Sequence, residues 1–359
     1  MGVQINKLDF KGQNLFIGID VHLKSWSVTI LSDHSVLKKF RQNPDAAALC
    51  KFLFVNYPNA DYHSVYEAGF SGFWLHHQLV GFGINNIVVN PADVPTMVKE
   101  KLRKTDAVDS SKLARELRSG TLKGIYVPSV ESLEIRSLIR LRKTIVKDST
   151  REKNRIKSLL HFHGIAIPEE FTKHSVGNWS KRFLAWLRTA ELSTEYGKKA
   201  LDMHIEQFVR LRAMLLEKTR LIRVLSRTET FIEPLRLITS VPGIGVTTGI
   251  SLLTEIDDVS RFKNAEHLAS YIGLVPMCHS SGDNENTGGI TIRKHATLRC
   301  YLIEAAWVAI RKDPAMTMAY AEYRKRMNSQ KSIVKIARKL VNRIYFVMKH
   351  KQEYVPCIV

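Results

Sequence analysis

The first 90 residues alternate short β-rich apolar runs with amphipathic, helix-like segments. Runs rich in Val, Ile, Leu and Phe and bounded by turn-forming residues are typical of strands, whereas apolar residues at helical spacing predict helices. On this pattern we predict strands at 14–23, 25–32, 35–43, 63–69 and 84–90, and helices at 45–55 and 73–80. The chain thus opens with three strands in succession and continues with alternating helix and strand.

This order of elements is that of an RNase H-like α/β fold. In α/β sheets, ligands commonly bind at the carboxyl ends of the strands. Asp20 stands at the end of the first predicted strand and Glu67 at the end of the fourth. Asp106 and Asp109 begin a predicted helix, and a spacing of three residues puts both on one face of it.

From about residue 130 the pattern changes to long, charged helices. Residues 129–165 contain nine Lys/Arg and four acids around a narrow apolar stripe, and a second helical stretch at 201–225 could return antiparallel to it. A coiled coil or helical hairpin is therefore predicted. Two interpretations of the charge stay open: a solvated helix face, or a nucleic-acid surface formed by Arg136, Arg140 and Lys143.

A third region begins with LITSVPGIGVTTGISLLTEI at 237–256. An apolar helix end, a Pro-Gly-x-Gly turn and a second helix form the pattern of a helix-hairpin-helix, in which glycines let backbone N–H groups approach a phosphate. Gly243 and Gly245 would make that approach. A plain turn between two core helices is the alternative.

The chain is strongly basic, with 54 Lys+Arg against 34 Asp+Glu and a formal net charge of +20. This charge favours a polyanion as partner, because each neutralised phosphate releases counterions. Nucleic acid is the leading candidate, and an acidic membrane surface the weaker one. A helical stretch at 321–351 holds ten Lys/Arg and one acid. We expect this stretch to contact the phosphate backbone of a nucleic acid through Lys335, Arg338 and Lys339.

The 359 residues, 45% of them hydrophobic, can bury more than one core. We predict three domains, at 1–128, 129–232 and 233–359. Four cysteines at irregular spacings fit a reducing compartment rather than a disulfide scaffold. No apolar run is long enough to span a bilayer, and the N-terminus lacks the pattern of a signal peptide. We therefore expect a soluble protein of a reducing cytoplasm.

Carboxylates at such defined places on a basic chain suggest metal ions that work on a nucleic acid. Mg²⁺ prefers a few carboxylates with waters and phosphate oxygens, and two ions can support both oxygens of a phosphoryl transfer. We predict that two Mg²⁺ ions, or Mn²⁺ in their place, bind to Asp20, Glu67, Asp106 and Asp109. The ordinary alternative is that the aspartates favour a helix start and that Glu67 is a solvated strand end.

A second constellation lies at 271–306. Ser280 and Ser281 precede Gly282 in a polar, Gly-rich loop, where a serine can approach a phosphate with little steric hindrance. Cations that could hold the scissile group flank this loop, namely Arg293, Lys294, His295 and Arg299. As composition alone the evidence is weak, because Ser-Ser-Gly is common in turns.

Zinc binding is a rival interpretation of the same segment. The four side chains concerned are Cys278, His279, His295 and Cys300. No paired CxxC or HxxxH spacing accompanies them, so the sequence favours zinc less than the metal site at the acids.

The motifs IGIDVH, YEAG, KTDAVDSSKLA, VPGIG and GLVP…SSG…GGITIRKHATLR…LIEAA follow one another over essentially the whole chain. In this order they resemble the DEDD transposases of bacterial insertion sequences, the family that also includes the pilin-segment invertase Piv. The chain departs from that family at GDNENTGG, where a basic stretch is usual, and at His295 and Ala296, where a glycine is common.

The resemblance implies a RuvC-like N-terminal domain, a helical oligomerisation region and a C-terminal transposase domain. The four acids would bind magnesium, and Ser281, or alternatively Ser280, would attack a DNA phosphate. The phosphoserine link would conserve the bond energy for rejoining. The resemblance also implies homo-oligomers (dimers or tetramers), donor and target DNA, a structured guide RNA from the element, and active sites shared between subunits. It further implies a location in the bacterial cytoplasm, at the nucleoid when the protein acts.

Two functions of other kinds stay open. A RuvC-like junction nuclease would need the acids but not the serine, because a metal-bound water would hydrolyse the DNA. A non-enzymatic nucleic-acid-binding protein would bind through the hairpin and the basic helices, and its acids would be structural.

Overall fold

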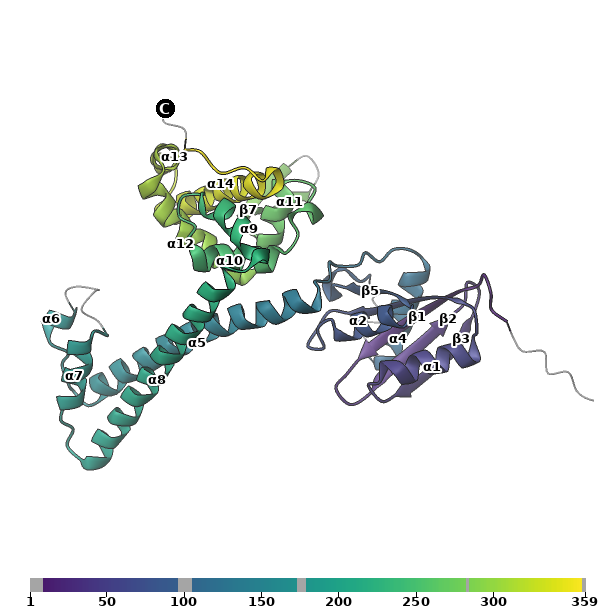
Figure 1. Ribbon diagram of the computed structural model, residues 1–359, viewed down its shortest axis with the longest axis horizontal. Helices are drawn as coiled ribbons and strands as arrows, with labels where there is room; N and C mark the ends of the chain where they lie inside the picture. The colour runs from purple at the N-terminus through teal and green to yellow at the C-terminus, as the bar shows by residue number, and fades with distance from the viewer. Residues whose placement is uncertain (1–8, 96–104, 173–178, 282–283, 357–359) are drawn as a thin grey trace, which may run out of the picture. The chain divides into compact units, whose positions relative to one another are not determined.

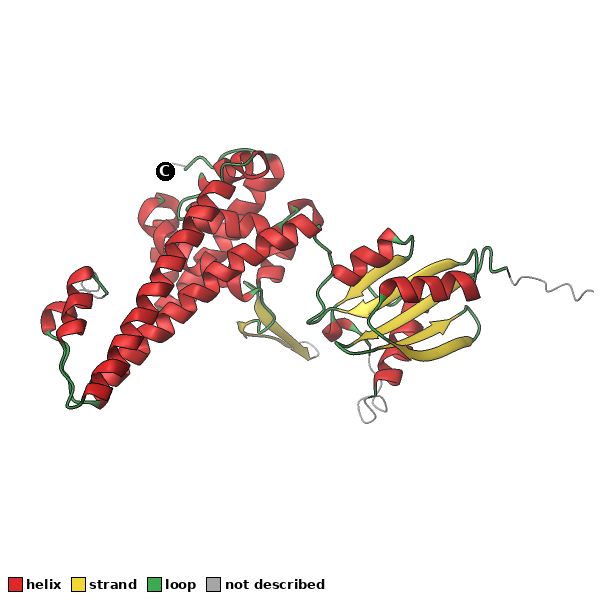
Figure 2. Cartoon of the chain, turned by 60° about the horizontal axis from the view of Figure 1, so that its bottom comes forward, coloured by secondary structure: helices red, strands yellow, loops and turns green. Residues whose placement is uncertain are grey.

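The computed structural model describes residues 9–95, 105–172, 179–281 and 284–356, and its contacts divide the chain into two compact units, Met1–Val130 and Glu131–Val359. Figure 1 shows both units, and Figure 2 shows that strands dominate the first and helices the second. The fold is therefore α/β at the N-terminus and mainly helical after it, as the sequence predicted.

A five-stranded mixed sheet forms the centre of the first unit, with strand order β3-β2-β1-β4-β5. β1 and β2 pair antiparallel, as do β2 and β3, whereas β1, β4 and β5 run parallel. The strands are β1 (Asn14–Val21), β2 (Trp26–Leu31), β3 (Val36–Gln42), β4 (Asp61–Glu67) and β5 (Asn85–Val89). The helices are α1 (Ala46–Asn56), α2 (Trp74–Gly81), η1 (Pro91–Asp93) and α4 (Asp106–Arg118). All five predicted strands and both predicted helices of this region are confirmed, with ends that differ by a few residues.

Gly18 determines how closely α4 packs on the sheet. A Cβ atom at this position of β1 would overlap the carbonyl oxygen of Ser110 and the amide nitrogen of Ala114, both on α4. Since only glycine fits, the backbone of the helix lies directly on the strand. Thr29 of β2 adds hydrogen bonds to the hydroxyls of Ser110 and Ser111, at 3.0 and 3.1 Å. The first turn of α4 is thereby fixed beside the end of β1.

The second unit begins with an antiparallel pair of long helices, α5 (Val130–Phe162) and α8 (Glu195–Leu225). Arg142 donates to the hydroxyl of Thr219 at 3.1 Å, and Glu152 pairs with His204 further along, so the helices run in opposite directions. The predicted helical hairpin is confirmed (Figure 1). Two short helices, α6 (Glu169–Thr172) and α7 (Lys181–Thr189), pack at its far end through a cluster of aromatic side chains.

The rest of the second unit is a helical core with one β-hairpin. Its elements are α9 (Glu229–Thr239), α10 (Val246–Ile256), η2 (Val259–Arg261), α11 (Ala265–Ile272), β6 (Pro276–Ser281), β7 (Asn284–Ile290), α12 (Ala296–Lys312), α13 (Pro314–Arg324) and α14 (Ser329–His350). Buried side chains from α9 to α14 form one continuous cluster.

Two predictions for this region need correction. The helix predicted at 321–351 is divided, because α13 ends at Arg324 and the side chain of Asn328 caps a new helix by accepting from the amide of Lys331. The loop predicted around the serines is instead largely a two-stranded antiparallel hairpin, β6–β7. Its polar, Gly-rich composition concealed the strands, since glycine and asparagine are poor indicators of β-structure.

The predicted turn between two helices is present after α9. Gly243 has a φ of +93°, and a Cβ atom there would overlap the carbonyl oxygen of Ala305 on α12. Gly245 is the N-cap residue of α10. The close approach to α12 accounts for the first glycine by packing alone, so the phosphate-binding role of this turn stays a prediction.

Candidate metal centre and serine hairpin

The four predicted acids come together at one edge of the sheet in the first unit. Asp20 lies near the carboxyl end of β1, and Glu67 is the last residue of β4. Because β1 and β4 are adjacent and parallel, their carboxyl ends meet at the same edge. Asp106 and Asp109 enter this edge from the first turn of α4, which Gly18 allows to lie on β1.

His22 joins two of the acids. Its Nε2 atom lies 3.1 Å from Oδ2 of Asp20 and 3.6 Å from Oδ1 of Asp106. One ligand atom from each of these residues lies within 4.8 Å of the other two, and no other such group of three occurs among the residues that the structure describes. Arg41 of β3 donates to Asp106 over 2.5 Å.

Lys112 joins the other two acids. Its Nζ atom lies 3.5 Å from Oε1 of Glu67 and 3.4 Å from Oδ1 of Asp109, and its side chain is only 8% exposed. The lysine lies one helical turn after Asp109, so it points to the same edge of the sheet.

The electrostatics of the cluster fit a divalent cation. Burial raises the pKa of Asp20, and the nearby carboxylates of Asp109 and Asp106 raise it further, while His22 lowers it. A carboxylate whose pKa is raised by burial and by neighbouring carboxylates is held in its ionised form by added positive charge. Aspartate oxygens are the ligands that Mg²⁺ and Mn²⁺ prefer, whereas an imidazole nitrogen is a softer ligand that suits transition-metal ions better than Mg²⁺. The residues present therefore suit such an ion.

Sequence reasoning missed three of these residues. His22 follows Asp20 by two positions, so the alternation of an extended chain places both on one side, and this signal was available in the sequence. Lys112 was detectable by its spacing of three from Asp109. Arg41 gave no signal, since 65 residues separate it from Asp106.

The predicted nucleophile lies at the turn of the β6–β7 hairpin. Ser280 pairs with Glu285 and Ser281 with Asn284 through the backbone of the two strands. The side chains of residues 278–287 lie outside the part of the chain that is described. Of the four residues in the zinc hypothesis, Cys278 and His279 have undescribed side chains, Cys300 is exposed, and Nε2 of His295 lies 3.3 Å from Glu255.

The base of this hairpin is firmly held. The amide of Thr291 donates to the carbonyl oxygen of Val275 at 3.0 Å. Arg299, which is buried, donates to the carbonyl oxygens of Thr291 and Arg293 at 2.7 and 3.4 Å. Burial lowers the pKa of its guanidinium. Arg293 and Lys294 are themselves exposed, so of the predicted anion-binding residues here, these two face solvent and Arg299 supports the backbone.

The cations predicted on the first long helix have partners within the second unit. Arg136 is buried and donates to the carbonyl oxygen of Thr254 at 2.6 Å. Arg140 forms a bidentate pair with Glu255, at 2.8 and 2.7 Å. Lys143 donates to the hydroxyl of Thr297 at 2.7 Å, and burial lowers its pKa. These bonds fasten α5 to α10 and α12, and whether any of the three also binds nucleic acid stays a prediction.

Glu255 of α10 contacts residues of both α5 and the start of α12. Only 1% exposed, it accepts from Arg140 and also lies 3.3 Å from Nε2 of His295, the N-cap residue of α12. Burial by itself would raise its pKa, but the hydrogen bonds from His295 and Arg140 outweigh this and lower the pKa to about 2. His295, predicted as an anion contact, is thus engaged by a carboxylate.

The cations predicted on the last helix differ in their surroundings. Arg338 donates to the carbonyl oxygen of Leu274 at 3.1 Å and to Glu266 at 3.2 Å. The ammonium of Lys335 lies 5.2 Å from the ring centre of Tyr323. Lys339 is exposed. An exposed cation such as Lys339 can reach a phosphate backbone, whereas Arg338 would first have to leave its partners.

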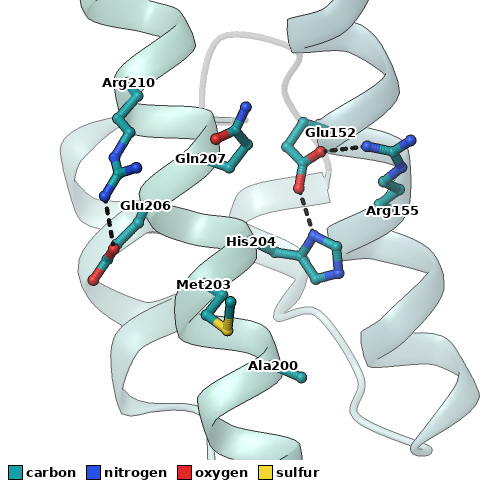
Figure 3. A pocket seen from close by; sticks show the side chains of 8 residues that line it. All are labelled: Glu152, Arg155, Ala200, Met203, His204, Glu206, Gln207 and Arg210. Carbon is teal, nitrogen blue, oxygen red and sulfur yellow. Dashed lines mark hydrogen bonds and ion pairs between the residues drawn. The ribbon is translucent and has the colours of Figure 1, made fainter.

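A pocket with several charged side chains in its lining lies on the α5–α8 pair, and none of the predicted site residues lines it. Figure 3 shows its lining, in which Glu152 accepts from both His204 and Arg155, and Glu206 pairs with Arg210. Its charged side chains are thus paired with one another. The sequence analysis gave no role to this pocket.

Carboxylates gathered on a basic chain, with surroundings that suit a divalent cation, are a combination found in metal-dependent proteins that act on phosphodiesters. Comparison with known families identifies the branch. Residues 17–165 match the DEDD transposase model of the IS110 type, described as "Transposase", and residues 235–321 match the model described as "Transposase IS116/IS110/IS902 family". The chain therefore carries two domains of the IS110 family of insertion-sequence transposases.

Individual relatives agree with this assignment. A putative transposase, y4qE, of Sinorhizobium fredii is 28% identical over 242 residues, which cover 67% of this chain and 57% of the relative. The transposase of element IS1111A of Coxiella burnetii is 25% identical, covering 68% of this chain and 64% of that protein. The pilin gene-inverting protein of Moraxella bovis is 31% identical over 33% of this chain and 38% of its own length. The chain thus matches somewhat more than half the length of the first two relatives.

None of the helices described is long and apolar enough to cross a membrane.

Proposed function

We propose that this chain cuts and rejoins DNA as the recombinase of an insertion sequence. The observation that carries the proposal is the convergence of Asp20, Glu67, Asp106 and Asp109, from three separate segments, at one edge of the sheet. The strand order β3-β2-β1-β4-β5, with its mixed directions, supports an RNase H-like or RuvC-like fold for this unit. The names of the relatives support transposition as the reaction.

The acids would act through a bound divalent ion. Asp20, His22 and Asp106 would hold Mg²⁺ or Mn²⁺, which neutralises charge on a DNA phosphate and so makes the phosphorus easier to attack. Arg41 stays 64% exposed although it pairs with Asp106, so it can also contact a phosphate oxygen there. These residues would bind and orient the scissile phosphate.

Ser281 would be the nucleophile, with Ser280 as the alternative. Its hydroxyl oxygen would form a bond to phosphorus and lose its proton, while the bond from phosphorus to one deoxyribose oxygen breaks and that oxygen takes up a proton. The phosphoserine ester keeps the number of phosphoester bonds constant, so a free DNA hydroxyl can reverse the step and rejoin strands. The firm base of the β6–β7 hairpin supports a role that needs an accurately held side chain.

DNA is the expected substrate, and a structured guide RNA and further copies of the chain are the expected partners. The net charge of +20 and exposed cations such as Arg293, Lys294 and Lys339 support polyanion binding. Sharing of acids and serine between subunits would follow from oligomer formation.

A covalent-adduct assay tests the serine mechanism. The protein is incubated with Mg²⁺, DNA that carries the flanks of its element and the candidate RNA, and the adduct is digested and mapped by mass spectrometry. We expect an adduct on Ser281 that is lost in Ser281→Ala, kept in Ser280→Ala and absent without metal. DNA joining with no adduct, or with an adduct elsewhere, would contradict the proposal. Cleavage that is unchanged in both serine variants would instead indicate a nuclease.

A further inference from the structure

The four carboxylates of the first unit fall into two pairs with different partners. Asp20 and Asp106 face the imidazole of His22, with ligand atoms within 4.8 Å of one another. Ligands of Mg²⁺ lie about 3 Å apart when adjacent and about 4 Å apart when opposite, so a small inward shift would complete this set. Glu67 and Asp109, in contrast, face the ammonium group of Lys112.

Lys112 occupies the space in which Glu67 and Asp109 would share an ion. Its Nζ atom is 3.5 and 3.4 Å from one oxygen of each. A second ion would need both oxygens at about 2 Å, in contact with a like-charged ammonium. The lysine cannot easily withdraw, since it is 8% exposed and its neighbours Leu113 and Ala114 are buried.

The charges of the site also indicate one metal ion instead of two. Four carboxylates supply four negative charges, the ammonium of Lys112 and the guanidinium of Arg41 supply two positive ones, and His22 would act as a neutral ligand of the ion. The remainder is two negative charges, which one divalent ion neutralises. A second divalent ion would leave the site with an excess of positive charge before any phosphate arrives.

We propose that Lys112 takes the place of a second metal ion, and that this unit binds a single divalent cation at Asp20, Asp106 and His22. The inference rests on the proposed metal site and departs from the two ions expected from the sequence. The ammonium pairs with both Glu67 and Asp109, so these two acids would position the lysine instead of coordinating metal.

The number of bound ions tests the proposal without any measurement of activity. The full chain is titrated with Mn²⁺, and the free ion is followed by electron paramagnetic resonance. We expect one ion per chain in the parent and two in Lys112→Met, which keeps the length and apolar stem of the side chain. The second ion should bind at least tenfold more tightly in this variant than in the parent. Lys112→Arg keeps the positive charge at this position, so this variant should bind one ion per chain, as the parent does.

Lys51→Met is the matched control, because Lys51 is exposed on α1 of the same unit and should leave the count at one. Circular dichroism establishes that each variant is folded, and Lys112→Gln replaces the methionine variant if that one is not. Two tight ions in the parent, or one ion in a folded Lys112→Met or Lys112→Gln chain, would overturn the role of Lys112 and leave the proposed function intact. No bound ion in the parent would reject the metal site itself.

Discussion

The buried carboxylate of Glu255 offers a direct test of how the second unit is held together. Its pKa falls from 4.5 to about 2 in the folded chain, because hydrogen bonds from His295 and Arg140 outweigh the effect of burial. A depression of this size corresponds to about 3 kcal/mol of stability when the group is ionised. Glu255→Gln removes the charge with little change of shape, so we expect a loss of about 3 kcal/mol at pH 7.

The pH dependence gives the sign of this effect. A carboxyl whose folded pKa lies below its unfolded pKa stabilises the protein fully above the unfolded value and less as the pH falls. The difference between parent and Glu255→Gln should therefore be constant above about pH 5, shrink below pH 4.5 and vanish near the folded pKa of about 2.

Urea unfolding, followed by pulsed hydrogen exchange of the α10 peptide and mass spectrometry, measures this difference locally. Glu266→Gln is the matched control, since Glu266 pairs with Arg338 but is 77% exposed, and it should change stability by less than about 0.5 kcal/mol. Equal protection of α10 in parent and Glu255→Gln at pH 7 would refute the reasoning. So would a difference that persists undiminished at pH 2.

Three further predictions concern packing and reactivity. Gly18→Ala should push α4 off the sheet, lower the stability of the first unit by roughly 1–3 kcal/mol in thermal unfolding and weaken Mn²⁺ binding, whereas Gly81→Ala, with open space around it, should do neither. Gly243→Ala meets both a positive φ and the carbonyl of Ala305, so its melting temperature should fall, and an unchanged value would argue against close packing of this turn on α12. Cys50, buried and with a pKa raised by burial to about 11, should resist iodoacetamide at pH 8 in the folded chain while exposed Cys300 reacts, as peptide mass spectrometry would show; early labelling of Cys50 would contradict its burial.

Local patterns in the sequence were sufficient for most of the first unit. β2 is buried along its whole length and reads as an apolar run, while Asp45 caps α1 where a helix start was expected. Asp20 and Glu67 were identifiable because they follow apolar strands, and the rule for parallel strands brings their ends together. The sequence could not show that Lys112 lies between two of the acids, since that depends on how closely α4 approaches β1.

Charge was harder to interpret than apolarity. Arg136 and Arg140 look like surface cations in a basic helix, yet their partners Thr254 and Glu255 lie 118 and 115 residues away. No local pattern reveals a partner at that separation. Arg299 also looks like a surface cation in the sequence, yet it is buried and donates to the carbonyl oxygen of Thr291 at the base of the β6–β7 hairpin.

The route of the chain through the metal centre has a consequence for protein synthesis. The candidate ligands lie at residues 20 and 22 and again at residue 106, with Glu67 between them in the sequence. A chain that ended before α4 would lack Asp106 and Asp109 and so would carry only part of the candidate metal site. Truncated products of the gene would then lack the metal centre, however well their strands pair.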